Sequence, residues 1–72
     1  MRNIIIKEIK EMVKNAESYV AFVNAFMHYQ EKLDGTNYFI VWDDDTDIIL
    51  IGNICSNQST ELDLAEEINA LD

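Results

Sequence analysis

The sequence has no proline, two glycines and one cysteine among its 72 residues. Without proline and with so little glycine, it contains no stretch typical of a flexible linker or a low-complexity segment. The single cysteine, Cys55, excludes a disulfide within the chain and is compatible with a reducing compartment. We therefore expect one domain, 1–72, close to the lower size limit for a self-sufficient hydrophobic core.

Long apolar runs are also absent. No stretch approaches the ~20 consecutive apolar residues that a membrane-spanning helix needs. Near the start, the apolar run Ile4–Ile6 ends at Lys7, which is too short for the apolar core of a secretory signal. We expect a cytoplasmic protein that does not bind membranes.

Basic residues are missing from the second half of the chain. Residues 1–33 carry all five basic residues and four acidic ones, whereas residues 34–72 carry ten acidic residues and no lysine or arginine. The net charge of −9 is therefore concentrated in the second half, which suggests a charged interaction surface. Direct binding to nucleic acid is disfavoured because the phosphates would be repelled, and a basic protein partner is favoured.

Residues 3–33 have the apolar spacing of an amphipathic helix. The repeat consists of Ile5, Ile9, Met12, Ala16, Tyr19, Val23, Phe26 and Leu33. One straight helix of this length would measure about 45 Å, far more than the radius of gyration of about 11 Å expected for so short a chain. We favour a break near Asn15, which is a candidate cap for a second helix, although the repeat itself continues through this region.

Residues 38–55 are predicted to form an antiparallel hairpin. The apolar runs Tyr38–Trp42 and Ile48–Ile51 flank the polar link Asp43–Asp47. Both faces of this hairpin are apolar, so each requires cover. The helices of the chain can cover one face, and the other needs a further helix, a second copy of the protein or a different partner.

The remaining segments complete an α+β domain. Gly35 suits the left-handed position after a helix, and Gly52 indicates a bulge or a close backbone approach in the second strand. A polar loop is expected over residues 56–60, followed by a C-terminal helix over residues 60–71 capped by Ser59 or Thr60. The predicted order is α(α)ββα, with the N-terminal helical segment and the C-terminal helix packed on the hairpin.

The acidic link has four interpretations, of which its own sequence excludes the first. Asp43, Asp45 and Asp47 alternate like the first ligands of a calcium-binding EF-hand, but Ile48 and Ile54 occupy the positions that require Gly and Glu, so that motif is excluded. Adventitious Ca²⁺ or Mg²⁺ binding is a second interpretation, and a solvated turn that prevents strand pairing is a third. We predict no metal or cofactor, and consider docking of this link into a basic pocket.

An enzyme is the least supported class. His28 and Cys55 are the sole imidazole and the sole thiol, and no glycine-rich turn or second acid marks either one as catalytic. Zinc would need more nitrogen and sulfur ligands than these two. Trp42 is expected either in the core or, beside the acidic link, as an aromatic anchor in an interface.

These observations favour a small acidic inhibitor that occupies a basic nucleic-acid-binding groove of a partner enzyme, as a mimic of DNA. The residues predicted to contact the partner are Trp42, Asp43, Asp44, Asp45, Asp47, Glu61, Asp63, Glu66 and Glu67. In size and charge the chain is similar to small acidic anti-CRISPR and anti-restriction proteins of phages and mobile elements, a likeness of composition that carries over no residues. The alternative is a homo-oligomeric structural or regulatory module, such as a homodimer, without mimicry.

Overall fold

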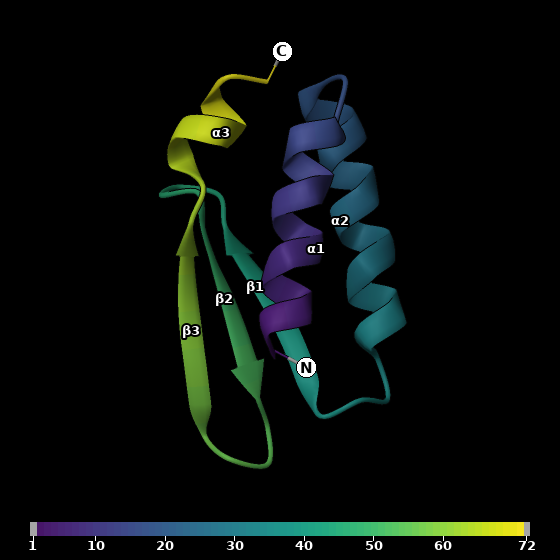
Figure 1. The fold of residues 1–72 in the computed structure, drawn as a ribbon, viewed down its shortest axis with the longest axis vertical. Coiled ribbons are helices and arrows are strands. Elements are labelled where there is room, and N and C mark those ends of the chain that lie inside the picture. Colours follow the sequence, from purple (N-terminus) through teal and green to yellow (C-terminus); the bar gives the residue numbers. More distant parts are fainter. Residues whose placement is uncertain (1, 72) are drawn as a thin grey trace.

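The apolar stripe of the first 33 residues folds as two helices, and the rest of the chain forms a sheet and a short helix. The computed structural model describes residues 2–71. Its elements are α1 (Arg2–Asn15), α2 (Tyr19–Leu33), β1 (Tyr38–Asp43), β2 (Ile48–Asn53), β3 (Gln58–Asp63) and α3 (Ala65–Asn69). The strands form an antiparallel sheet in the order β1-β2-β3, and α1 and α2 lie side by side against it (Figure 1). The predicted α+β class is confirmed.

The break between the helices lies where it was favoured, but a different residue caps the second helix. Asn15 ends α1, and Ser18 is the cap of α2, where its Oγ accepts a hydrogen bond from the Ala21 N–H at 3.1 Å. The prediction that Asn15 caps α2 is therefore wrong. The longest extent of the molecule is 36 Å, which an unbroken helix of about 45 Å would exceed.

The break also shifts the apolar stripe. The buried residues of α1 are Ile5, Ile9 and Val13, and those of α2 are Phe22, Phe26, Tyr29 and Leu33. Tyr19, which continued the repeat in the sequence, is 39% exposed. Phe26 and Leu33 of the repeat are buried, whereas Phe22 is buried in place of Tyr19, so the buried face of α2 keeps part of the repeat.

One face of the sheet, called the inner face, packs against α1 and α2. It carries Ile40, Ile49 and Ile51, which are all buried, together with the half-buried Trp42. The Trp42 ring lies 5.2–5.8 Å from the rings of Tyr19, Phe22 and Phe26. Trp42 thus joins β1 to α2, and the core interpretation of this residue is confirmed.

The main departure from expectation is a third strand. Residues 56–60 were expected to be a loop and residues 60–71 a helix, but β3 occupies 58–63 and α3 only 65–69. Thr60 and Leu62 lie on the inner face, opposite Ile51 and Ile49, and both are half-buried. Pairing with β2 therefore overrides the helical preference of this segment. Leu64, directly before α3, and Ile68, within it, are both buried.

Both glycines occupy the positions that the sequence suggested. Gly35 follows α2 with a φ of 87°, in the left-handed region. Gly52 lies beneath the Phe39 ring, and a Cβ atom at this position would overlap that ring. Close approach of Phe39, and not a bulge, is therefore the reason for Gly52, because the β1–β2 register continues through it without interruption. Among residues 2–71, no helix has both the length and the apolar character needed to cross a membrane.

Candidate acidic protein-binding surface

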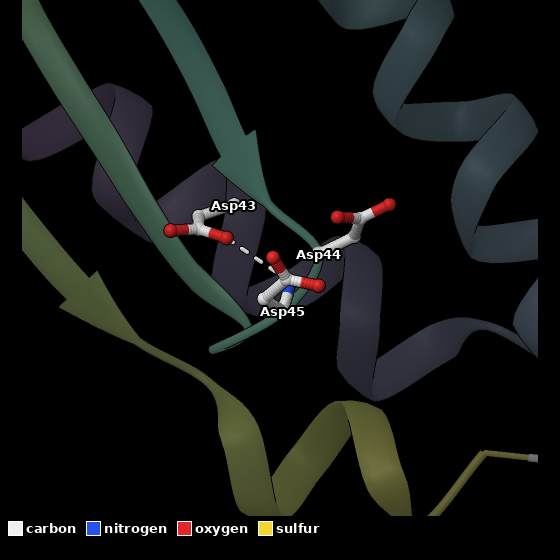
Figure 2. A group of neighbouring side chains, drawn as sticks. All are labelled: Asp43, Asp44 and Asp45. Atoms are coloured by element: carbon white, nitrogen blue, oxygen red, sulfur yellow. Dashed lines mark hydrogen bonds between the residues drawn. The ribbon is translucent and has the colours of Figure 1, made fainter.

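The link between β1 and β2 gathers three carboxylates in a small volume. The Asp43 Oδ1 accepts a hydrogen bond from the Asp45 N–H at 3.0 Å, which folds the turn back on itself. One carboxylate oxygen from each of Asp43, Asp44 and Asp45 lies within 4.8 Å of the others, and all three residues are exposed (Figure 2). Carboxylates at this spacing repel one another, so the turn presents a concentrated negative charge to solvent.

Asp47 differs from its neighbours because it is bound into the fold. Its backbone has a φ of 58°, and its Oδ1 accepts a hydrogen bond from the Trp42 Nε1–H at 3.1 Å. Its backbone oxygen accepts a second bond from the Leu64 N–H at 3.1 Å. Asp47 therefore holds the acidic turn against the core tryptophan and against the junction of β3 and α3. Two predicted contact residues, Trp42 and Asp47, thus support the turn from within.

The strand register brings further acids to the same surface. Asp43 pairs with Ile48, and Ile48 pairs with Asp63, so these three side chains form one row across the sheet. Two interstrand spacings separate Asp43 from Asp63 by about 10 Å. Glu61 lies in the next row, opposite Leu50. The structure therefore joins acids that are far apart in the sequence.

These acids border an apolar patch on the outer face of the sheet, the face turned away from α1 and α2 (Figure 1). Phe39 is 38% exposed and Val41 is 50% exposed, and Ile48 and Leu50 are half-buried between them and β3. Both long helices lie on the inner face. The hairpin face that was predicted to need additional cover is thus left open within residues 2–71.

The remaining predicted contact residues follow β3. Glu66 and Glu67 are exposed in the first turn of α3, which lies at the same end of the sheet as the acidic turn (Figure 1). Glu67 lines a groove together with Lys10 and Lys14 of α1. This carboxylate therefore borders the basic residues of the first half, whereas no basic residue occurs in the strands or their turns.

The residues considered for catalysis lie in different elements. His28 is exposed on α2, and Cys55 is exposed in the turn between β2 and β3. A groove of about 400 Å³ between α1 and α2 includes His28, Glu8 and the buried Tyr29. Burial, together with a hydrogen bond to Glu8 and the charge of Glu8, raises the pKa of Tyr29 above its ordinary value. The Tyr29 phenol of α2 thus lies beside the Glu8 carboxylate of α1.

The acidic turn supplies only part of a metal coordination shell. Calcium takes six to eight oxygen ligands, and the three clustered carboxylates are exposed side chains of one short turn. We therefore assign no metal site to these three carboxylates.

No protein-family model, curated protein or solved structure matches this chain. Its function must therefore be argued from the surface itself. Sequence reasoning missed that Glu61 and Asp63 belong to a strand, although the alternation of Ser59, Glu61 and Asp63 with Thr60 and Leu62 is the pattern of a half-buried strand.

Proposed function

We propose that this protein is a small acidic inhibitor that binds a basic nucleic-acid-binding groove of a partner protein. The observation that supports this function is the row Asp43–Ile48–Asp63, which unites the acidic turn with the acids of β3 on strands that contain no basic residue. Clustered carboxylates at fixed spacings resemble the regular charges of a nucleic-acid backbone, for which such a groove is adapted.

The mechanism is occupation of the groove. Lysine and arginine side chains that otherwise bind phosphates bind Asp43, Asp44, Asp45 and Asp63 instead, and nucleic acid is excluded by charge and by volume. Long-range attraction makes association fast, and added salt weakens it. This mode of action takes place in the cytoplasm and needs neither a catalytic residue nor a cofactor.

A rigid turn makes this binding more favourable. The hydrogen bonds of Asp43 and Asp47 hold the backbone of the turn before a partner is met. Fewer conformations are therefore lost on binding than a disordered acidic segment would lose.

The test is capture of the partner by the tagged protein from a lysate of the organism that encodes it, followed by measurement of the purified pair. We expect capture at low salt, loss at high salt and displacement by added duplex DNA. The triple variant D43N/D44N/D45N should bind the purified partner at least about tenfold more weakly.

A matched control removes the same number of charges elsewhere. This control is the triple variant E11Q/E31Q/D34N. It changes one exposed acid in α1, one in α2 and one at the C-terminal cap of α2, and it should bind like the parent protein. Equal weakening by the two triple variants would show that only net charge matters, and would contradict a specific acidic surface.

Self-association is the second candidate function, and exposure of Phe39 and Val41 on the open face favours it. A homodimer formed through this face should become monomeric in the variant Val41→Lys. The control is Met27→Lys on α2, where the side chain is 54% exposed on another surface. Mass measured by sedimentation distinguishes the outcomes, and a parent protein that is monomeric at every concentration would exclude this function.

A further inference from the structure

The two edge strands of the sheet, β1 and β3, differ in whether side chains bind their outward backbone groups. At the edge formed by β1, the Gln30 Nε2 donates a hydrogen bond to the Ile40 oxygen at 3.0 Å. The Thr36 Oγ1 accepts a hydrogen bond from the Tyr38 N–H at 3.1 Å, and its own O–H donates to the Leu33 oxygen at 2.6 Å. Side chains of α2 and of the following connection thus bind backbone groups that a further strand would need.

At the edge formed by β3, the Arg2 guanidinium of α1 donates to the side chains of Thr60 and Gln58 on the inner face, at 2.9 Å each. Within residues 2–71, no side chain binds the outward backbone groups of this strand. The Leu64 N–H donates to the Asp47 oxygen, one position beyond the last β2–β3 pair. Because hydrogen-bonded and non-bonded pairs alternate along an antiparallel ladder, residues 58, 60 and 62 face β2 with their backbone groups. The N–H and C=O groups of Ser59, Glu61 and Asp63 therefore point away from the sheet. Within residues 2–71, β3 is the last strand on this side (Figure 1).

The side chains beside this open edge are acidic. Glu61 and Asp63 project from the outer face, and both are exposed, as is Ser59. A strand added at this edge would place alternate side chains directly beside them on the same face. The edge therefore discriminates between incoming strands by the charge of every second residue.

We propose that β3 binds an extended basic segment of the partner by strand addition, with lysine or arginine at alternate positions facing Ser59, Glu61 and Asp63. This inference rests on the proposed function and specifies how the partner docks. The backbone hydrogen bonds contribute affinity for any extended strand, and the pairing of basic with acidic side chains contributes the selectivity for a basic one.

A second copy of this chain is a poor occupant of the edge. Pairing of β3 with the same strand of another molecule would place Glu61 and Asp63 beside the same acids, and residues 58–63 contain no basic residue. Like charges directly opposite each other in a sheet are destabilising. The acids thus oppose self-pairing and permit a basic strand.

The probe is a nine-residue peptide of alternating lysine and valine, acetylated and amidated at its ends. Calorimetry should show saturable binding to the parent protein. In NMR spectra the amides of Ser59, Glu61 and Asp63 should gain protection from hydrogen exchange. The amides of Gln58, Thr60 and Leu62 already face β2, and should change less.

Two N-methylated forms of this peptide provide the decisive comparison on the unaltered protein. Lysine residues that face Glu61 with their side chains also direct their backbone N–H groups toward β3, whereas the valine N–H groups point outward. Methylation of the lysine amides should weaken binding at least tenfold, and methylation of the valine amides should change it less than threefold. Equal effects of the two peptides, or no binding of the unmethylated peptide, would overturn strand addition.

A protein variant tests the same edge from the other side. Ser59→Pro removes an outward N–H without changing charge, and proline is tolerated at such positions of edge strands. It should weaken peptide binding at least tenfold, whereas Ser59→Ala should bind like the parent. Tenfold weakening by Ser59→Ala as well would contradict a backbone contact.

The two proposals fail in different ways. If the partner is lost by D43N/D44N/D45N but not by Ser59→Pro, the acidic surface binds the partner and strand addition is wrong. If the peptide binds the edge as described but D43N/D44N/D45N still binds the partner like the parent, the groove-binding function is wrong and the edge stands as a peptide site.

Discussion

The two turns of the sheet have closely similar local geometry but opposite chemical character. In the first, the Asp43 side chain accepts the N–H two residues ahead at 3.0 Å, and Asp47 closes the turn with a φ of 58°. In the second, the Asn53 side chain accepts the Cys55 N–H at 2.9 Å, and Asn57 closes the turn with a φ of 56°. Each turn therefore starts and ends with an Asp or Asn that performs the same local task.

The second turn shows that this backbone conformation does not require carboxylates. Asparagine meets the conformational requirements of the second turn, so the first turn does not need carboxylates for its backbone. Asp44 and Asp45 correspond to Ile54 and Cys55, which are exposed and uncharged. The charges of the first turn are therefore available for binding, and only Asp47 has an additional contact with the core.

The largest expected effect is a loss of partner affinity when two carboxylates are moved from the first turn to the second. Replacing Asp44 and Asp45 by Asn, with Ile54→Asp and Cys55→Asp, keeps the net charge but moves two carboxylates to the opposite end of the sheet (Figure 1). Partner affinity should fall at least about tenfold, or about 1.4 kcal/mol, because the carboxylates no longer adjoin Asp63. Calorimetry measures the change, and unchanged affinity would mean that the location of the charges is irrelevant.

A smaller effect concerns stability and compares the residues that close the turns. Asp47→Ala should lower the free energy of unfolding by about 2–3 kcal/mol, because it removes the hydrogen bond to Trp42 and places alanine at a positive φ. Asn57→Ala should cost about 1 kcal/mol, for the backbone conformation alone. Urea unfolding measures both values. Asp47→Asn retains an oxygen acceptor and should remain within about 1 kcal/mol of the parent, so a larger loss would assign the contribution of Asp47 to its charge.

The smallest effect is electrostatic and depends on salt. Asp44→Asn should raise the free energy of unfolding by a few tenths of a kcal/mol at low ionic strength, because it relieves repulsion within the turn. The gain should disappear near 1 M salt, where the screening length is about 3 Å. Cys55→Ser in the uncharged turn is the control and should show no such salt dependence. A gain that persists in high salt would indicate a cause other than charge.

Much of the fold could be predicted from short-range patterns. The hairpin of β1 and β2 and the left-handed Gly35 follow from local apolar spacing or from the properties of a single residue. The break between the helices follows from the length of the apolar stripe, which one straight helix could not fit into so small a molecule. β3 was missed because Ser59 and Thr60 before Glu61 resemble the capped start of a helix. Partial burial of Leu62 and Thr60 against β2 decides the outcome, and this contact cannot be recognised before the sheet is known.

The candidate surface was predictable in composition but not in arrangement. The sequence shows that the acids lie in the second half, yet the adjacency of Asp43 and Asp63 depends on the register of both strand pairs. The same is true of Gln30, which only interrupted the apolar repeat in the sequence. In the structure it binds the Ile40 oxygen, a contact that requires α2 to lie along β1.

Occupation of the β1 edge by Gln30 and Thr36 has a consequence for stoichiometry. A sheet with two receptive edges can accept strands on both sides and grow into a fibre. Gln30 and Thr36 bind two of the backbone groups that a strand added at β1 would need, so addition of one strand at β3 is favoured over growth on both sides. Complexes formed at this edge should therefore contain one molecule of each component and should not polymerise at high concentration.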